Sequence, residues 1–528
     1  MTEPLVVAVD CSTTAAKAVI LDRSGRVVAS ASRPLALNRP HPSWHEQDAE
    51  EWWTATLGSV AQAVAALDDP GQVRAMCLTH QRESFVCLDD GGRPLRPAIL
   101  WLDGRAHAEI AELGSPRVHE LSGKPPDTTP ALYKLAWLAR HEPSVLRTAT
   151  RVGDVQAFLS LRLTGEWATS PASADTLGLF DARRQTWAPE LLEMAGVRAE
   201  QLPDLVPAGE LLGTIGAGVA ATLGLPGPVP LVAGVGDGQA AGLALGSRSD
   251  VAYLNLGTSM VLGVQSEEYL WDPAFRTLAG VAPGRYTLET VLNAAAYLAG
   301  WFRTELGTDD DVVPRGSDGS GPDARGADAL ETAAAALTPG AEGLLTLPYW
   351  NAAQTPYWDP LARGAVVGWH GRHTRAHAYR SILEGVGFEL RLHLERLEAA
   401  TGRGIRSIRM VGGGARSPLW VRIIADITQR PVRVCADREV SAAGAALLAW
   451  AFLDSAGTRG PRGDGAAAVA AAAGVGEPVG VDILPDPAAA SAYGTLFAVH
   501  GRLYGRLRET FAELAAVDAS VRSSEPPG

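Results

Sequence analysis

The chain has few cysteines, no excess of basic charge and no apolar segment of membrane-spanning length. Its four cysteines show no Cys-x-x-Cys spacing, so neither a disulfide framework nor a cysteine zinc site is indicated. Asp and Glu outnumber Lys and Arg by 59 to 46, for a net charge of -13, which argues against a general nucleic-acid-binding surface. No apolar run approaches the roughly 20 residues that cross a bilayer. These absences predict a cytoplasmic protein with neither a nucleic-acid nor a membrane partner.

The chain also lacks a Gly-x-x-x-x-Gly-Lys-Ser/Thr loop, which argues against a P-loop kinase. At 528 residues it is too long for one hydrophobic core, and we expect two or more domains. β-rich runs alternate with helical patterns from the start of the chain, which is typical of an α/β fold. We expect strands at 6–9, 16–21, 27–32, 74–78, 85–88 and 231–234, and helices at 49–67, 131–141, 239–245 and 488–513.

Two segments about half a chain apart share one pattern: a β-rich run, a tight turn of small hydroxyl residues and a second β-rich run. The first covers residues 6–21 and the second residues 251–262. A hairpin turn of this kind directs backbone N–H groups and hydroxyls the same way, which suits a phosphate oxygen. The repeat predicts two related domains that face one nucleotide.

A third segment carries a triple glycine between a strand and a helix. Residues 408–411 form the strand pattern, Gly412, Gly413 and Gly414 follow, and Ser417 and Pro418 are typical of a helix start. Glycines permit a close approach of backbone to a ribose or a flat ring, and a helix N-terminus favours anions. Taken alone, the same pattern also fits a tightly packed strand-to-helix turn.

Two aspartates occupy positions where a carboxylate could act on a phosphate or on a hydroxyl. Asp237 stands in a glycine-rich loop at 234–238, where little side-chain bulk would obstruct an approaching hydroxyl, so it is the candidate base. The alternative is a simple helix cap. Asp10 ends the first strand beside the first turn, where a carboxylate could hold Mg²⁺ through water. The alternative there is an Asx-turn.

These motifs, in this order, resemble the FGGY carbohydrate kinases, a family that includes glycerol kinase, xylulokinase and ribulokinase. The resemblance spans most of the chain. The chain departs from the family pattern in the first turn, where Cys11 and Ser12 replace the usual glycine. The segments that carry it are residues 10–17, 44–53, 101–105, 233–239, 256–259, 364–385 and 412–420.

The resemblance implies an α/β fold of two actin-like (ribonuclease H-like) ATPase domains that flank a nucleotide cleft. It implies an N-terminal, acceptor-binding domain at 4–247 and a C-terminal, ATP-binding domain at 250–454. Residues 455–480, rich in Ala, Gly and Pro, are interpreted as a linker or loop, and 481–528 as a helical segment and tail. Residues 313–328 are read as a further insertion. A homodimer is an option that the sequence leaves open.

The resemblance also implies a role for individual residues in MgATP-dependent phosphorylation of a sugar or polyol. Asp237 falls on the catalytic base, and Asp10 and Asp237 on the metal-associated acids. The residues that fall in the ATP-binding motifs are Thr13, Thr14, Lys17, Gly257, Thr258, Gly413, Gly414 and Ser417.

The acceptor pocket is expected around Gln81, Arg82, Glu83, Trp101 and Asp237. The first three resemble glycerol kinase, in which an Arg–Glu pair binds acceptor hydroxyls, since Arg donates and Glu accepts. The alternatives are an Arg–Glu ion pair that only shapes the loop and a tryptophan that belongs to the core.

Other segments point away from glycerol. Residues 163–169 and 178–181 resemble xylulokinases more closely. Gly238 follows the base at a position where glycerol kinases and xylulokinases both carry an amide side chain, and we expect the missing side chain to leave more room. The sequence therefore favours a ketopentose, with a glycerol or tetritol kinase as the alternative. An alternative of a different class is a non-catalytic actin-like sugar sensor or ATPase.

A cluster of histidines suggests a metal site, but we do not expect a metal to bind there. His370, His373 and His377 lie within eight residues, but Arg372 and Arg375 would repel a cation and no acidic residue adjoins them. We interpret the segment as a basic stretch that leads into a helix.

Overall fold

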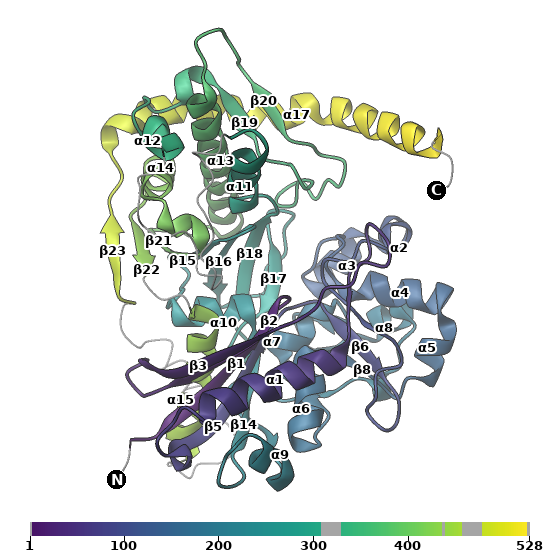
Figure 1. Ribbon diagram of the computed structural model, residues 1–528. Coiled ribbons are helices and arrows are strands. Elements are labelled where there is room, and N and C mark those ends of the chain that lie inside the picture. Colours follow the sequence, from purple (N-terminus) through teal and green to yellow (C-terminus); the bar gives the residue numbers. More distant parts are fainter. Residues whose placement is uncertain (1–2, 308–328, 436–438, 457–477, 525–528) are drawn as a thin grey trace.

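The computed structural model describes residues 3–307, 329–435, 439–456 and 478–524, and is built around two large mixed sheets (Figure 1). The N-terminal sheet has the strand order β13-β14-β5-β1-β2-β3. Strands β1, β2 and β3 are antiparallel neighbours, and β5 and β14 run parallel to β1. Its strands are β1 Leu5–Cys11, β2 Ala15–Leu21, β3 Val27–Pro34, β5 Val73–His80, β13 Leu211–Thr214 and β14 Pro230–Gly236.

The C-terminal sheet repeats this plan with one further strand, in the order β17-β18-β16-β15-β21-β22-β23. A hairpin, β15–β16, is followed outward by antiparallel β18, while β21 and β22 run parallel to β15 on its other side. The duplication expected from the two turns is therefore confirmed in the topology. The strands are β15 Val251–Leu256, β16 Met260–Ser266, β17 Arg276–Ala279, β18 Tyr286–Leu292, β21 Ser407–Val411, β22 Val432–Cys435 and β23 Gly480–Ile483.

A smaller lobe, drawn in blue in Figure 1, is inserted in the N-terminal half. It combines a four-stranded sheet of order β4-β7-β6-β8 with a cluster of helices over an apolar core. Its strands are β4 Glu46–Gln47, β6 Phe85–Leu88, β7 Ala98–Ile99 and β8 Arg151–Asp154. Its helices are α2 His107–Leu113, α3 Pro116–Ser122, α4 Ala131–His141, α5 Pro143–Thr148 and α8 Pro189–Ala195.

Helix α1, Ala49–Val64, covers the N-terminal sheet over β2 and β3. It begins where the sequence predicts, because the Asp48 side chain accepts the N–H of Glu50 as an N-cap. Further helices of this half are α6 Val155–Thr164, α7 Pro171–Ala174 and α9 Ala217–Thr222.

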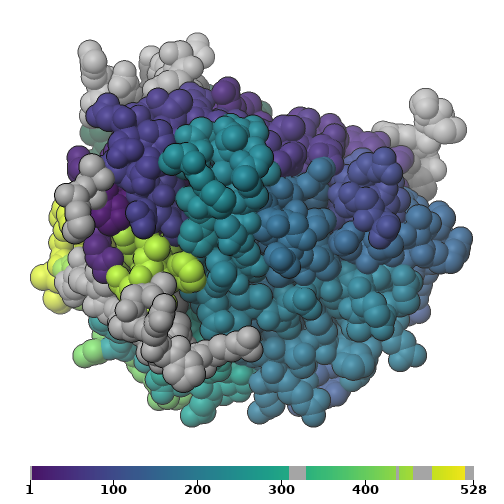
Figure 2. Space-filling view, turned by 90° about the horizontal axis from the view of Figure 1, so that it is seen from below, coloured from purple at the N-terminus to yellow at the C-terminus, as the bar shows by residue number. Residues whose placement is uncertain are grey.

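Two helices join the halves. Helix α10, Asp237–Ala244, packs against α15, Val440–Ala456, and α15 in turn packs on β1, β5 and β14 of the N-terminal sheet. The shared core is largely alanine, which lets the backbones approach closely. Seen from below, the yellow-green atoms of this late segment lie beside purple and teal N-terminal residues (Figure 2). A helix from the end of the chain is thus part of the N-terminal half.

The other helices belong to the C-terminal half. They are α11 Ala296–Glu305, α12 Ala329–Ala335, α13 Arg375–Thr401, α14 Pro418–Thr428 and α17 Pro487–Ser524, with a short hairpin of β19 Leu345–Leu347 and β20 Ala365–Val367. The late helix packs on α13, α14 and β19, as predicted for residues 488–513.

In the two large sheets, strands β13, β17, β18, β22 and β23 are additions to the predicted elements, and β23 pairs with β22 at the sheet edge. The insertion predicted at 313–328 and most of the linker predicted at 455–480 lie outside the described residues. Within the described part of the chain, no helix is long and apolar enough to cross a membrane.

Candidate active site

Asp237 lies at the first position of α10, directly after β14 ends at Gly236. Its Oδ1 atom accepts the N–H of Gly238 at 2.7 Å and lies 3.1 Å from Nε of Arg82. Among the described residues its Oδ2 has no hydrogen-bond partner, and the side chain is 40% exposed. One carboxylate oxygen is therefore fixed and the other is available to a hydroxyl in the pocket.

Asp10 lies near the end of β1, paired in register with Lys17 of β2. Its Oδ1 is buried without a hydrogen-bond partner. Burial, followed by the negative charges of Asp237 and Glu439, raises the pKa of Asp10 to about 8. A buried oxygen that lacks a partner beside two other carboxylates is a donor set that suits a hard divalent cation such as Mg²⁺.

A pocket of about 410 Å³ lies between the two sheets and receives residues from both halves. Asp10 contributes from the N-terminal half, and Gly412, Gly413, Arg416 and Glu439 from the C-terminal half. This pocket adjoins a second one, since Asn255 and Ser441 line both.

Two of the three glycines, Gly412 and Gly413, line this pocket, and Gly412 and Gly414 also pack closely on Leu256. Gly413 lines the pocket and a Cβ on it would meet nothing within 4 Å. Gly412 has a φ of 95°, and a Cβ there would lie 2.7 Å from the Leu256 carbonyl oxygen, while one on Gly414 would lie 2.5 Å from a Leu256 methyl. Ser417 caps α14 by accepting the N–H of Trp420. Of the predicted adenosine residues, Gly413 therefore faces the cavity, and Gly414 and Ser417 shape the turn beside it.

The first hydroxyl turn reaches toward the acceptor side. Thr13 Oγ1 donates to Gln81 Oε1 at 3.1 Å and accepts from Trp101 Nε1 at 3.0 Å. Ser12 closes the turn with its hydroxyl on the Ala15 carbonyl at 2.9 Å, which is how a non-glycine residue is accommodated there. The hydroxyl of Thr13 thus links the phosphate turn to the predicted acceptor residues.

The remaining predicted ATP residues, Thr14, Lys17, Gly257 and Thr258, line neither of these two pockets. Lys17 forms an ion pair with Glu439 of the opposite half, and Thr14 and Thr258 are exposed. The carbonyls of Gly257 and Thr258 accept N–H groups at the start of α11, so their own N–H groups are not used in those bonds. Their contact with a phosphate stays a prediction.

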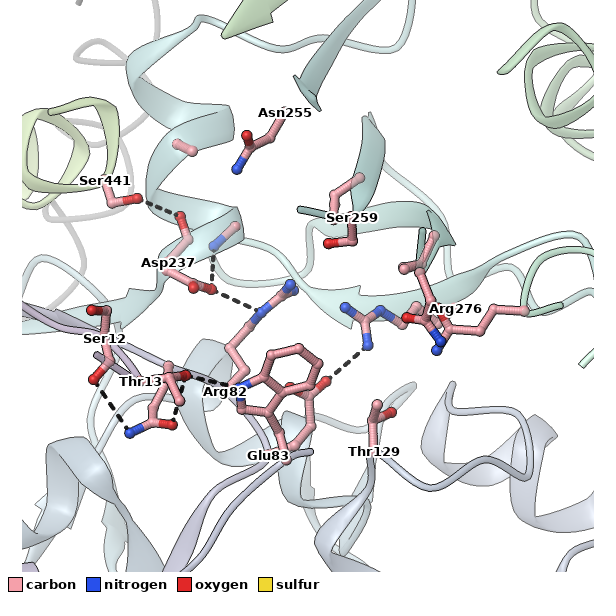
Figure 3. A pocket seen from close by; sticks show the side chains of 18 of the residues that line it. Ser12, Thr13, Arg82, Glu83, Thr129, Asp237, Asn255, Ser259, Arg276 and Ser441 are labelled. Carbon is pink, nitrogen blue, oxygen red and sulfur yellow. Dashed lines mark hydrogen bonds and ion pairs between the residues drawn. The ribbon is translucent and has the colours of Figure 1, made fainter. Parts of the chain in front are cut away.

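The second pocket has a volume of about 200 Å³ and contains every predicted acceptor residue (Figure 3). Gln81, Arg82, Glu83, Trp101 and Asp237 all line it. The C-terminal half adds residues that were not predicted to line the acceptor pocket: two lie in the segment at 251–262 that carries the second hydroxyl turn, and the others are scattered along the chain without a local motif. These are Tyr253, Ser259, Arg276, Asn293 and Gln354.

The central charges of this pocket are paired across the two halves. Arg82 Nη1 lies 3.1 Å from both carboxylate oxygens of Glu289, and Arg276 Nη1 donates to Glu83 at 2.9 Å. The alternative of an Arg82–Glu83 pair that only shapes its own loop is therefore wrong. Burial alone would raise the pKa of Glu289, but Arg82 and Arg276 lower it to about 2.

The room expected beside Gly238 is filled. A Cβ at this position would lie 3.0 Å from Cζ and Nη2 of Arg82 and 3.0 Å from Oε2 of Glu289. The expectation of extra space is therefore wrong: the guanidinium and carboxylate occupy the space that an amide side chain would need. Sequence alone could not show this, because Glu289 comes from the other half of the chain.

In the structure, the histidine segment lies beside an acidic residue. Ligand atoms of Glu342, His370 and His373 lie within 4.8 Å of one another. However, Nδ1 of His370 accepts the Arg372 N–H and Nδ1 of His373 accepts the His370 N–H. These bonds place the proton of each neutral ring on Nε2, where a metal would have to bind. The geometry favours a hydrogen-bonded turn.

Models of the N-terminal and C-terminal domains of the FGGY family of carbohydrate kinases match residues 5–244 and 252–452. The chain belongs to this family. A xylulose kinase from Escherichia coli K12 is 33% identical to this FGGY kinase over 457 residues, 84% of this chain and 89% of that protein. A glycerol kinase from Dechloromonas aromatica is 31% identical over 468 residues, 85% of this chain and 88% of that protein. The crystal structure of a xylulose kinase from Rhodospirillum rubrum has a TM-score of 0.83 and 29% identity, covering 96% of this chain and 100% of that chain.

Family membership confirms the predicted fold class of two actin-like α/β domains and the predicted reaction class. This FGGY kinase uses ATP to phosphorylate a sugar or polyol. The domain boundaries and the roles of single residues stay predictions, supported by the geometry above.

Proposed function

We propose that this FGGY kinase transfers a phosphoryl group from ATP to a hydroxyl of a neutral ketopentose, with Asp237 as the base. The observation that carries the proposal is the placement of Asp237. Its free carboxylate oxygen faces the acceptor pocket, and its charge acts on Asp10 of the adjoining glycine-lined pocket. A hydroxyl in one pocket and a phosphate in the other would meet at this carboxylate.

The chemistry needs little more from the protein than position and charge. Phosphoryl transfer is catalysed mainly by alignment of the reacting oxygens and by electrostatic stabilisation. Asp237 orients the acceptor hydroxyl with Oδ2 and accepts its proton as the new bond forms. Gly238 and Arg82 hold Oδ1, so the carboxylate does not rotate away.

Asp10 and Asp237 would hold Mg²⁺, in part through water, and Glu439 contributes negative charge at the same place. The buried and unpartnered Oδ1 of Asp10 fits this role. When bound, the ion supplies charge neutralisation for the phosphates.

The charges of the acceptor pocket favour a neutral acceptor. Three carboxylates, Asp237, Glu83 and Glu289, face two guanidiniums, Arg82 and Arg276, and every guanidinium already contacts a carboxylate. A sugar acid would add another negative charge, whereas hydroxyls can both donate to carboxylates and accept from arginine. The likeness to xylulose kinases supports a ketopentose among neutral acceptors.

A glycerol or tetritol kinase is the second candidate. It is favoured by the Gln81-Arg82-Glu83 sequence and by the glycerol kinase relatives. Both candidates share Asp237 and the nucleotide site, and they differ only in how many hydroxyls the pocket must hold.

The test measures ATP consumption by the wild-type protein with D-xylulose, D-ribulose, erythritol and glycerol, each with Mg²⁺. We expect the highest kcat/KM with a pentulose. A preference for glycerol or erythritol would overturn the ketopentose assignment and select the second candidate. Failure of every acceptor to stimulate ATP consumption would contradict the proposal and favour a sugar sensor or an ATPase.

A further inference from the structure

Four charged side chains at the acceptor pocket are joined across the two halves by three ion pairs, and the peptide bond between Arg82 and Glu83 completes what we call the charge ring. Arg82 and Glu83 come from the N-terminal half, and Arg276 and Glu289 from β17 and β18 of the C-terminal half. Arg82 contacts Glu289, and Arg276 Nε donates to Glu289 at 2.7 Å. Arg276 Nη1 donates to Glu83 (Figure 3). All four side chains are buried.

We propose that Glu289 and Arg276 are positioning residues for acceptor recognition. Glu289 holds Arg82 beside Asp237, and Arg276 orients Glu83 toward the acceptor. The inference rests on the proposed function, and it assigns half of the acceptor-recognition machinery to the C-terminal half of the chain.

The first step is the path of Arg82, which crosses the turn that carries the base. A Cβ on Gly236 would lie 2.5 Å from Cγ of Arg82, and one on Gly238 would lie 3.0 Å from its Cζ. The two glycines on either side of Asp237 therefore form the slot in which Arg82 lies. Any displacement of the guanidinium is transmitted directly to the Asp237 carboxylate.

The second step is how Glu289 limits the contact between Arg82 and the base. Nη1 of Arg82 is bound to both carboxylate oxygens of Glu289, and Nε lies 3.1 Å from Oδ1 of Asp237. An arginine without Glu289 would be free to bind the Asp237 carboxylate through two parallel N–H groups, the geometry that carboxylates and guanidiniums prefer. Both oxygens of the base would then be occupied, and the acceptor hydroxyl would lose its proton acceptor.

The third step concerns the groups that remain available to an acceptor. Across the described part of the chain, Nη2 of Arg82 and Oε2 of Glu83 have no hydrogen-bond partner. One is a donor and the other an acceptor, and both belong to residues that line the pocket. They can bind neighbouring hydroxyls, and their directions are set by Glu289 and Arg276.

Glu289 is itself firmly held. The hydroxyl of Tyr253 donates to Glu289 Oε2 at 2.6 Å from β15, and Glu289 is 0% exposed. The two arginines keep Glu289 ionised, since they lower its pKa to about 2. The C-terminal half thus presents a fixed negative charge to Arg82 at any pH where the enzyme would work.

The test compares Glu289→Gln and Arg276→Gln with wild type, using the most active acceptor among D-xylulose, D-ribulose, erythritol and glycerol. Glu384→Gln is the matched control, because Glu384 is a buried glutamate paired with Arg380 at 2.7 Å on α13, and none of its hydrogen-bond partners lines the pocket. We expect kcat/KM for the acceptor to fall about 10- to 100-fold in the two ring variants, the loss typical of a charge-assisted hydrogen bond. The dissociation constant for ATP, measured without acceptor, should change less than about 3-fold in all three.

An unchanged acceptor kcat/KM in a folded Glu289→Gln variant would overturn the inference, and so would equal losses in acceptor turnover and ATP affinity. Should Glu289→Gln fail to fold, Glu289→Asp keeps the charge and shortens the side chain, and the inference requires it to lower acceptor kcat/KM while leaving ATP affinity intact. Absence of turnover by wild type with all four acceptors would instead refute the proposed function, on which the inference rests.

Discussion

The two sides of the cleft differ in how the halves of the chain are joined. On the acceptor side the contacts are buried: besides the charge ring, Lys124 Nζ donates to the Thr277 carbonyl at 2.6 Å and Asp175 accepts the Ala279 N–H at 2.8 Å. On the nucleotide side the ion pair between Lys17 and Glu439 is partly exposed, with side chains 34% and 26% accessible.

The contacts on the two sides differ in how strongly they hold the halves together. Breaking a buried ion pair leaves an uncompensated charge and costs about 3–5 kcal/mol, whereas an exposed pair contributes about 0–1 kcal/mol. The ion pairs across the acceptor side therefore resist separation of the halves more than the Lys17–Glu439 pair does.

The largest expected effect comes from the residue that lies where the two sides meet. Asp237→Asn removes the proton acceptor but can keep the contact with Arg82, so kcat should fall by about 10²- to 10⁴-fold with little change in ATP affinity. Steady-state kinetics with the best acceptor measures this. Thermal unfolding within a few degrees of wild type is the control, and a variant as fast as wild type would show that Asp237 is not the base.

The next largest effect is expected for Mg²⁺ binding on the nucleotide side, and it depends on pH. In metal-free protein the folded state binds a proton at Asp10 up to about pH 8. Because this pKa is raised above its unfolded value, the Asp10 contribution to stability falls as pH rises from about 4 to about 8. Mg²⁺ competes with that proton, so its apparent affinity should weaken by up to about tenfold per pH unit below pH 8.

Titration of Mg²⁺ against thermal unfolding at pH 6 and pH 8 measures this competition. Wild type should be stabilised by Mg²⁺ at pH 8 and much less at pH 6, and Asp10→Asn should lose the difference. Equal stabilisation of Asp10→Asn and wild type at pH 8 would contradict the assignment of Asp10 to the metal.

A smaller effect is expected from steric pressure on the acceptor side. Gly238→Ala places a Cβ 3.0 Å from both members of the Arg82–Glu289 pair, so we expect acceptor KM to rise about 3- to 10-fold, equivalent to about 1 kcal/mol. Gly494→Ala is the matched control, since a Cβ there meets nothing within 4 Å. An unaltered acceptor KM would mean that the pair can shift without consequence.

The smallest effect is expected for the ion pair on the nucleotide side. Glu439→Gln should lower the free energy of unfolding by less than about 1 kcal/mol. The comparison variant is Lys124→Met, which leaves Asp175 buried without its cation and should cost about 3–5 kcal/mol. Denaturant unfolding of both variants checks the difference, and similar values would remove the distinction between the two sides.

Local pattern predicted the elements of the fold well. The hairpin turns, the N-cap at Asp48, the strand before Asp237 and the helix start at Ser417 all depend on neighbouring residues, and all are found. The edge strand β23 was missed, because its four residues are too few to show a strand pattern and it pairs with β22 at the sheet edge.

The site residues also differ in whether the local sequence identified them. Motifs identified Asp237, Arg82 and Glu83, because each lies in a compact segment with an unusual pattern. Arg276 and Glu289 lie in strands of ordinary composition, so nothing local distinguished them from surface or core residues. The interpretation of Gly238 as extra space was wrong because Arg82 fills that space together with Glu289, and Glu289 comes from the other half.

The sequence by itself determined the reaction class, since turns, glycines and carboxylates at set spacings are local properties of the chain. Only the tertiary structure decided which charges neutralise one another. Glu289 has its pKa lowered to about 2 and Asp10 has its pKa raised to about 8, although both are buried glutamate or aspartate side chains. The physical reason is that ionisation of a buried carboxylate depends on the charges within a few ångströms, and folding brings those from distant parts of the chain.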